Sequence, residues 1–164
     1  MDETPGSLRS PAIAHRLERE QVLPGMPEEV FPFFADARNL EALTPPFLGF
    51  RILTPLPIEM REGTLIDYSL SLFGFPVRWK TRISVWEPGV RFVDEQLSGP
   101  YALWRHTHSF ERRGAGTLMR DVVEYREPLG PLGTLAHRLF VARTVERIFD
   151  YRREAVVGLL QRVA

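Results

Sequence analysis

The chain has 164 residues, a mass of 18.9 kDa and no cysteine, and its 21 basic residues balance 21 acidic ones. With 44% hydrophobic and 26% charged residues it has the composition of a globular domain, which excludes a disordered or collagen-like chain. The even charge disfavours a dedicated nucleic-acid or anionic-membrane binder. The absence of cysteine excludes disulfides and predicts a reducing, cytoplasmic location.

The first residues predict a tail followed by a strand. Residues 1–12 are rich in Pro, Gly and Ser and lack the apolar stretch of a signal peptide, so we expect a flexible tail before a single domain at 13–164. The weak, charged alternation of residues 14–23 is typical of an exposed edge strand. No apolar run reaches the roughly 20 residues that span a bilayer, so we predict no integral membrane association.

Two short helices are predicted next. The first begins near Pro27, because a proline is tolerated in the first turn and the two following glutamates favour the positive end of the helix dipole. Pro32 is expected to kink or end this helix. Asp36 is the expected N-cap of a second helix that reaches Leu43.

The middle of the chain predicts a succession of strands with short connections that contain Gly and Pro. Such connections indicate an antiparallel meander, because parallel neighbours need long crossovers. The expected strands are residues 49–54, 64–73, 77–86, 90–97, 101–111 and 117–125. In the third of these, one face carries Val77, Trp79, Thr81, Ile83 and Val85, and the other carries Arg78, Lys80, Arg82 and Ser84.

After residue 131 the apolar residues recur at steps of three and four, which predicts a helix of about 30 residues and roughly 45 Å. Its stripe contains Leu135, Leu139, Ala142, Val145, Ile148, Phe149, Arg152, Val156, Leu159, Leu160 and Val163. Such a stripe must be buried, and the concave face of the sheet is the surface available to it. The predicted fold class is therefore α+β: a curved antiparallel sheet of six to seven strands with two short helices and a long C-terminal helix.

This order of elements resembles the helix-grip fold of the SRPBCC superfamily, which includes START lipid-transfer domains, plant pathogenesis-related allergens, polyketide cyclases and coenzyme Q-binding proteins. Several motifs are similar to those of a bacterial ligand-binding SRPBCC subfamily, and the resemblance covers about residues 14–163. The motifs are residues 27–31 (PEEVF), 35–40 (ADARNL), 43–46 (LTPP), 94–96 (DEQ), 99–101 (GPY), 104–110 (WRHTHSF) and 125–130 (YREPLG). The resemblance implies a cavity between sheet and helix that takes an apolar or amphipathic small molecule.

The alternation of the strands predicts which side chains face this cavity. On strand 101–111 the bulkier face carries Trp104, His106 and His108, and we expect that face to point inward. The same reasoning for the neighbouring strands and the helix stripe gives a mainly apolar wall with a few polar groups. The candidate ligand-binding residues are Tyr68, Trp79, Phe92, Asp94, Gln96, Trp104, His106, His108, Asp121, Tyr125 and Arg152.

His106 and His108 lie two residues apart, so they share one face of a strand, and three interpretations follow. With Asp94 or Asp121 they could form a metal site, but a third strong ligand at a diagnostic spacing is absent, so we assign no metal and no cofactor. Either histidine is a candidate general base with Asp121 as its orienting partner. The favoured interpretation is a pair of buried histidines that hydrogen-bond to carboxylates and orient the interior.

We therefore predict a carrier or sensor of a hydrophobic or amphipathic molecule: a lipid, an isoprenoid or quinone, or an aromatic polyketide-like compound. The alternative is a cyclase- or dehydratase-type enzyme that uses His106 or His108. Exposed loops alone support a third interpretation, a protein–protein module. Loops 43–49 and 73–75 are candidates for a lid or for transient membrane contact. The arginines of the long helix are expected on a solvated face, so no nucleic-acid partner is predicted, and the oligomeric state is left open.

Overall fold

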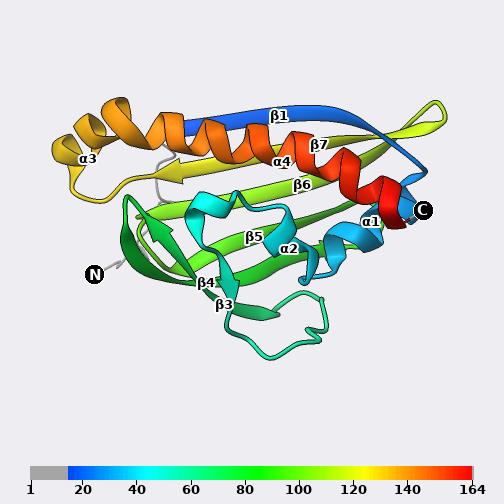
Figure 1. Ribbon diagram of the computed structural model, residues 1–164, viewed down its shortest axis with the longest axis horizontal. Coiled ribbons are helices and arrows are strands. Elements are labelled where there is room, and N and C mark those ends of the chain that lie inside the picture. Colours follow the sequence, from blue (N-terminus) through cyan, green and yellow to red (C-terminus); the bar gives the residue numbers. More distant parts are fainter. Residues whose placement is uncertain (1–14, 164) are drawn as a thin grey trace, which may run out of the picture.

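A computed structural model describes residues 15–163, with side chains as far as Gln161, and it contains the elements in the expected order (Figure 1). The predicted tail at 1–12 lies outside the described residues. In chain order the elements are β1 (His15–Pro24), α1 (Pro27–Ala35), α2 (Asn39–Ala42), η1 (Pro46–Leu48), β2 (Arg51–Ile52), β3 (Leu65–Leu72), β4 (Phe75–Glu87), β5 (Arg91–Ser98), β6 (Leu103–Arg113), β7 (Gly116–Arg126), α3 (Gly130–Ala136), the π-helical segment η2 (His137–Val141) and α4 (Ala142–Val163).

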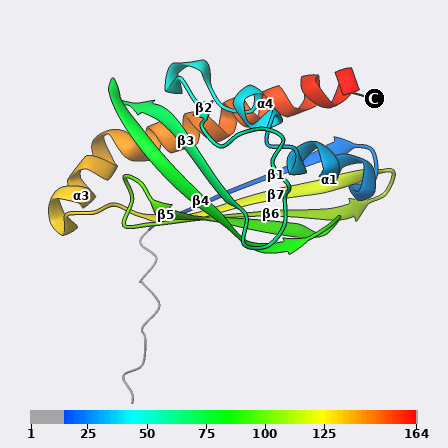
Figure 2. The same ribbon diagram turned by 90° about the horizontal axis from the view of Figure 1, so that it is seen from below.

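The described strands form one seven-stranded antiparallel sheet in the order β1-β7-β6-β5-β4-β3-β2. The first strand pairs with the last, with His15 opposite Tyr125 and Pro24 opposite Gly116. The sheet is curved, and α4 runs along its concave side (Figures 1 and 2). The α+β helix-grip prediction is confirmed. None of the described helices is long and apolar enough to cross a membrane.

The two short helices differ from the prediction in their bounds. Pro32 neither ends α1 nor prevents three further residues from being helical. Pro32 is exposed, so the carbonyl that loses its partner can meet water, while buried Phe31 and Phe33 hold the helix by packing. The second helix begins at Asn39 rather than after Asp36, because the Asp36 carboxylate accepts a bond from the Arg38 N–H (2.9 Å) and caps a turn that precedes the helix.

A β-bulge in β4 reverses part of the predicted face pattern. Ile83 lies opposite Asp94 but Val85 lies opposite Val93, so Ser84 is the extra residue. Trp86 therefore replaces Val85 on the inner side, where its ring meets the edge of Phe31 at 5.2 Å between ring centroids. An inserted residue shifts the two-residue period by one, and this exchanges the two faces of the strand.

The long C-terminal helix is present, but its apolar stripe is buried only in α4. Val145, Phe149 and Val156 are buried, whereas the predicted stripe members Leu135 and Leu139 are 55% and 51% exposed. In η2 the N–H of Ala142 bonds to the carbonyl of His137, five residues earlier, which inserts one residue into the helical repeat. The stripe of the first turns is therefore out of phase with that of α4, and α3 lies at the far end of the sheet (Figure 1). The side chain of Val163 lies outside the described ones.

Many of the buried apolar residues belong to two clusters. The larger is built around Phe31, whose ring meets those of Phe92 and Phe110 edge to face at 5.9 and 5.3 Å between ring centroids. The smaller joins β7 to α4 and consists of Val123, Tyr125, Val145 and Phe149. A cavity contacts both clusters, because Phe92 and Phe149 stand in its wall.

Candidate functional site

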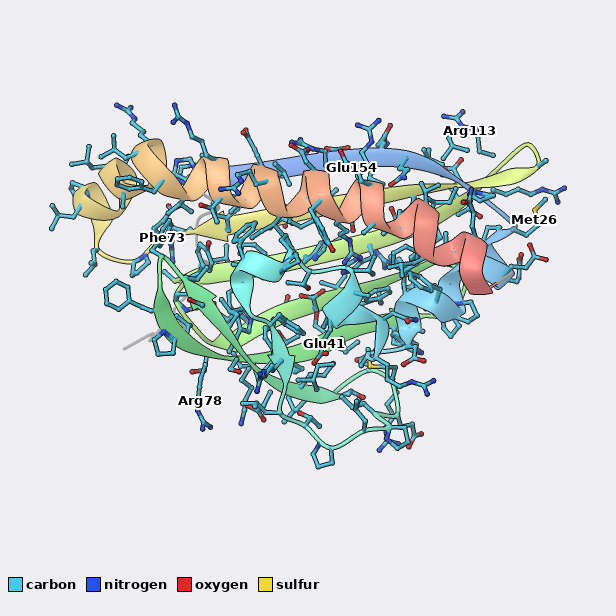
Figure 3. All side chains as sticks on the ribbon, viewed as in Figure 1. Met26, Glu41, Phe73, Arg78, Arg113 and Glu154 are labelled. Atoms are coloured by element: carbon cyan, nitrogen blue, oxygen red, sulfur yellow. The ribbon has the colours of Figure 1, made fainter. Side chains whose placement is uncertain are left out.

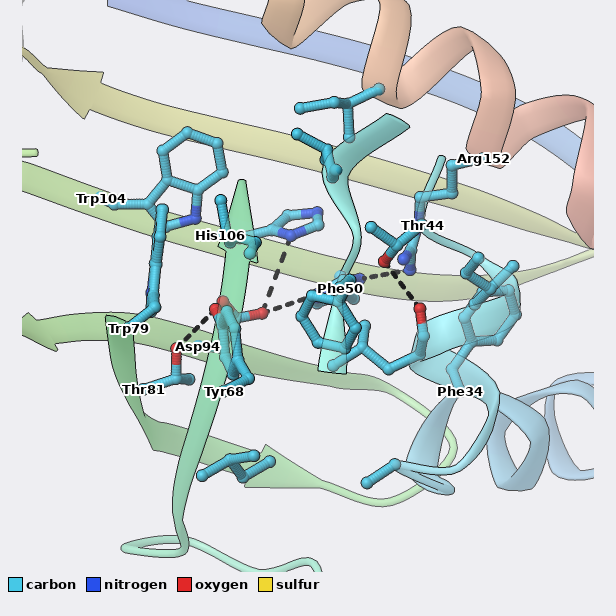
Figure 4. A pocket seen from close by; sticks show the side chains of 18 of the residues that line it. Phe34, Thr44, Phe50, Tyr68, Trp79, Thr81, Asp94, Trp104, His106 and Arg152 are labelled. Carbon is cyan, nitrogen blue, oxygen red and sulfur yellow. Dashed lines mark hydrogen bonds and ion pairs between the residues drawn. The ribbon is translucent and has the colours of Figure 1, made fainter. Parts of the chain in front are cut away.

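A cavity of about 170 Å³ lies between the concave side of the sheet and the helices (Figure 4). Most of its wall is apolar, and its polar groups come from strands β3 to β6, from α4 and from the segments that follow α1 and α2. The cavity is lined by Phe34, Asp36, Ala37, Leu40, Leu43, Thr44, Leu48, Phe50, Met60, Ile66, Tyr68, Leu70, Leu72, Trp79, Thr81, Ile83, Phe92, Asp94, Tyr101, Trp104, His106, His108, Ile148, Phe149 and Arg152.

Aromatic rings form one part of the wall. Trp79 meets Trp104 edge to face at 5.3 Å between ring centroids and lies 5.6 Å from Tyr101. The hydroxyl of Tyr68 hydrogen-bonds to that of Thr81 at 3.0 Å, and burial raises the pKa of Tyr68, so this phenol remains protonated. The indole Nε1 of Trp79 is buried and has no hydrogen-bond partner among the described residues. Trp79 lines the cavity, and the unpaired state of its buried N–H costs about 1–3 kcal/mol.

Two histidines and two aspartates form a connected polar cluster on β5, β6 and β7. Nε2 of His106 lies 2.9 Å from Oδ1 of Asp121, and Nε2 of His108 lies 2.9 Å from Oδ2 of Asp94. Nδ1 of His108 also lies 2.9 Å from Oδ1 of Asp121, so both nitrogens of His108 have a carboxylate partner. Nδ1 of His106 lies 3.7 Å from Oδ2 of Asp94, beyond hydrogen-bond distance.

Arg152 of α4 reaches this cluster from the opposite side. Its Nη2 lies 3.3 Å from Nδ1 of His108, and its Nε lies 3.4 Å from Oδ2 of Asp121. The guanidinium also lies over the ring of Phe34, 5.5 Å from the ring centroid. The side chain of Arg152 is 10% exposed. Its position on the apolar stripe of α4 therefore places a permanent positive charge in the protein interior, beside the aspartates.

The surroundings of the cluster shift its pKa values. Burial alone would raise the pKa of Asp121, but the charge of Arg152 and hydrogen bonds from His106 and His108 hold that pKa well below its usual range. The pKa of Asp94 is also lowered, because the hydrogen bond from His108 and the nearby positive charges outweigh burial. Burial, assisted by the charge of His108, lowers the pKa of His106. At pH 7 the carboxylates are therefore ionised and His106 is neutral.

The structure places eight of the eleven predicted residues in the cavity wall: Tyr68, Trp79, Phe92, Asp94, Trp104, His106, His108 and Arg152. The other three stand behind it. Gln96 is bound by its amide to both backbone groups of Tyr101, at 2.7 and 3.2 Å. Asp121 supports the histidines, and Tyr125 packs against Trp104 and hydrogen-bonds to His137 at 3.0 Å.

Sequence reasoning did not include among the ligand-binding residues the part of the wall that comes from the short helices and the loops. Phe34 and Leu43 belong to the short helical region, Phe50 and Met60 to loops, and Tyr101 to the turn before β6. Strand alternation carries no information about these positions. The sequence signal that could have found Tyr101 was its place in the motif at 99–101, directly before the predicted inward face.

Asp94, His106 and His108 also have the donor atoms of a metal site, all within 4.8 Å of one another. Spacing along the chain did not reveal the third donor, because Asp94 comes from the neighbouring strand. The Arg152 guanidinium beside His108 opposes a cation at this position. We therefore retain the metal-free assignment for this cluster as an expectation.

A second hollow of about 440 Å³ lies beside the cavity and shares Leu48 and Leu72 with it. It lies between η1, the β3–β4 hairpin and η2. Phe73 at the hairpin tip is 58% exposed and has φ 53, a left-handed conformation that a bulky residue rarely adopts (Figure 3). The ring of Phe73 meets that of Phe140 across the hollow at 6.2 Å between ring centroids. This hollow, called the mouth below, is thus rimmed by exposed aromatic side chains.

Comparison with known proteins shows what this architecture resembles. No family model matches the chain, and no curated protein matches it in sequence. Among solved structures, Zhui aromatase/cyclase from Streptomyces sp. R1128 has a TM-score of 0.72 at 17% identity, over 90% of this chain and 94% of that one. Ara h 8.0201 has a TM-score of 0.61 at 16% identity, over 90% and 97% of the two chains.

A third similar structure is a nucleoside-diphosphate sugar epimerase from Corynebacterium glutamicum, with a TM-score of 0.64 and 26% identity. The match covers 88% of this chain but 29% of the epimerase. These likenesses confirm the helix-grip fold that the sequence resemblance predicted. Because fold does not fix function, what the chain does must be argued from its site.

Proposed function

We propose that this helix-grip protein binds an amphipathic small molecule that carries an oxygenated ring, and acts as its carrier or sensor. The observation that carries the proposal is the unpartnered N–H of Trp79, a residue that lines an apolar cavity. A ligand oxygen that accepts from this N–H would remove the cost of the unpaired donor. The same cavity has Asp94 in its wall, an ionised acceptor that is 19% exposed. A hydroxyl group can accept from the indole and donate to the carboxylate.

The dimensions limit which part of a ligand enters. A cavity of about 170 Å³ is close to the 150 Å³ of an engineered apolar cavity that takes up benzene. One ring therefore fits, and the remainder of a lipid, isoprenoid or polyketide-like molecule would extend past Leu48 and Leu72 into the mouth. The exposed rings at the mouth would then contact the ligand tail, or a bilayer surface during transient exchange.

Calorimetric titration with 4-propylphenol and propylbenzene tests this proposal, since the two probes differ by one hydroxyl group. We expect the phenol to bind about 10-fold more tightly, which is the effect of one hydrogen bond of about 1.4 kcal/mol. Trp79→Phe should reduce this preference, because it removes the N–H and keeps an aromatic ring. Leu70→Trp should weaken both probes by filling the cavity.

Trp86→Phe is the matched control, since Trp86 packs against Phe31 outside the cavity wall. Near-ultraviolet circular dichroism checks that each variant is folded. Failure of wild type to bind either probe, or an equal phenol preference in Trp79→Phe, would contradict the proposal. Native mass spectrometry of protein purified without organic solvent should in addition detect the natural ligand.

One observation favours a second candidate, catalysis of the cyclase or dehydratase type. When Nε2–H of His106 donates to Asp121, Nδ1 keeps a free lone pair in the cavity wall, and the lowered pKa keeps the ring neutral. His108 is a poorer base, because both of its nitrogens are engaged. With the native ligand in D₂O, wild type should promote deuterium incorporation at an acidic C–H bond and His106→Gln should not. Equal incorporation by the variant would exclude His106 as the base.

A further inference from the structure

A second group of metal-binding side chains lies at the α3 end of the sheet, away from the central cluster. His15 opens β1, Glu127 follows β7, and His137 opens the π-helical segment η2. The three residues are distant in sequence, and pairing of the first strand with the last brings them together. The chain has four histidines, of which His106 and His108 belong to the central cluster.

The donor atoms converge at distances that suit one ion. Nε2 of His15 lies 3.0 Å from Oε2 of Glu127, and Nε2 of His137 lies 3.9 Å from Oε1 of the same carboxylate. All three donors lie within 4.8 Å of one another. Tetrahedral ligands at about 2.0–2.1 Å from zinc are roughly 3.3 Å apart, between the two measured distances. The hydroxyl of Tyr125, 3.0 Å from Nε2 of His137, lies beside the same space.

One buried carboxylate oxygen of the group has no hydrogen-bond donor among the described residues. Oε1 of Glu127 is buried and accepts no hydrogen bond from any described residue, and the Glu127 side chain is 8% exposed. A carboxylate oxygen in such a position is costly unless a cation or donor satisfies it. The imidazoles are more open, at 23% and 15% exposed, so an ion can reach the site from solvent.

We propose that His15, Glu127 and His137 bind a divalent transition-metal ion of the zinc class, with a fourth position left for water. Two imidazoles and one carboxylate form the donor set of open zinc sites and of other first-row metals. The rings of His15 and His137 are stacked, with centroids 3.5 Å apart and planes inclined by 11°. Because an ion lies in the plane of each imidazole that binds it, metal binding must rotate the two rings out of this stack.

An ion at this site would fasten three segments to one another: the first strand, the end of the last strand and the π-helical segment. The same segment carries Leu139 and Phe140, which line the mouth of the cavity. A bound metal ion would therefore hold in place the π-helical segment that forms this part of the mouth wall. This inference is independent of the ligand proposed for the cavity.

The test uses the full chain without a histidine tag, stripped with chelator and titrated calorimetrically with ZnCl₂ at pH 7.5. We expect one ion per chain. Glu127→Gln and His137→Asn should each weaken the affinity by more than about 100-fold, beyond the loss seen for an outer-shell partner. The double variant His106→Asn/His108→Asn is the matched control and should retain the affinity. Zinc should also raise the melting temperature of wild type, but not that of Glu127→Gln.

Circular dichroism verifies that the variants fold, and His15→Asn at the sheet edge replaces a ligand variant that does not. A chain that binds no zinc would overturn the proposal. So would zinc binding that survives in Glu127→Gln and His137→Asn and is lost in the double variant, since the ion would then occupy the central cluster. Visible absorption of bound Co²⁺ provides a second readout, which the same variants should abolish.

Discussion

Replacement of Arg152 by glutamine tests whether the central cluster depends on a cation supplied by the helix. The guanidinium lies 3.4 Å from Asp121 and 3.3 Å from His108, in a side chain that is 10% exposed. Glutamine keeps part of the length and polarity of the side chain and removes its charge. Asp121, 11% exposed, then retains its negative charge without the nearby positive one.

The expected loss follows from this geometry. Removal of one partner from a buried ion pair costs 3–5 kcal/mol, because the other charge remains buried. His106 and His108 still hydrogen-bond to Asp121, so we expect the lower end of that range, about 3 kcal/mol. This is a large part of the 5–15 kcal/mol that stabilises an ordinary domain. Adding Asp121→Asn removes the stranded charge and should restore about 1–2 kcal/mol.

Urea unfolding at pH 7, followed by tryptophan fluorescence, measures these free energies. Arg153→Gln is the control, because Arg153 is the next residue on the same helix and its side chain is exposed. That variant should change the stability by less than about 0.5 kcal/mol. If Arg152→Gln costs no more than the control, or if the double variant is less stable than Arg152→Gln alone, the assigned role of the ion pair is wrong.

Two further predictions concern pH and two glycines. The folded-state pKa of His106 is lowered, so below about pH 6.5 the unfolded chain gains a proton that the folded chain does not. The unfolding free energy should therefore fall between pH 7 and pH 5, by up to about 1.4 kcal/mol per pH unit. Asp94 and Asp121 also have lowered pKa values, so a further loss of unfolding free energy is expected below about pH 4. Urea titrations should show that the unfolding free energy of His106→Gln depends less steeply on pH between pH 7 and pH 5 than that of wild type. An equal slope would refute the assignment. Gly116→Ala should cost about 1–3 kcal/mol, since its Cβ would lie 2.6 Å from the Leu23 carbonyl oxygen. Gly158 lies in an exposed part of α4, and a Cβ added there would meet no atom within 4 Å. Gly158→Ala should therefore raise the unfolding free energy by about 0.5–1 kcal/mol. Melting curves in which the two glycine variants shift the stability in the same direction would contradict this reasoning.

The elements with strong periodic patterns could be predicted from the sequence, and those whose phase is interrupted could not. The alternation around Trp104, His106 and His108 places all three in the cavity wall, because β6 has no irregularity in its pairing with β7. In β4 the same reasoning fails after Ile83, since nothing about Ser84 marks it as the extra residue of a bulge. The π-helical turn likewise depends on packing, and it displaces Leu135 and Leu139 from the expected stripe.

The polar cluster, too, could be predicted from the sequence only in part. Its inward residues followed from alternation, but the pairing of His108 with Asp94 and of His106 with Asp121 depends on registers between strands that a sequence does not specify. The group formed by His15, Glu127 and His137 was not predicted, because its members share no element and no spacing. Contacts between the first strand and the last helix exist only after the whole sheet is assembled.

The pairing of β1 with β7 also has a consequence for the order of folding. Glu20 and Arg120, opposite each other in this ladder, are 100 positions apart in the sequence. At 5–20 residues per second a ribosome takes about 5–20 s to make that interval, during which the emerging β1 has no partner. Its alternating charged residues keep the nascent edge from pairing with other chains. Closure of this long-range ladder is thus expected to be the late, slow event of folding, as contact order requires.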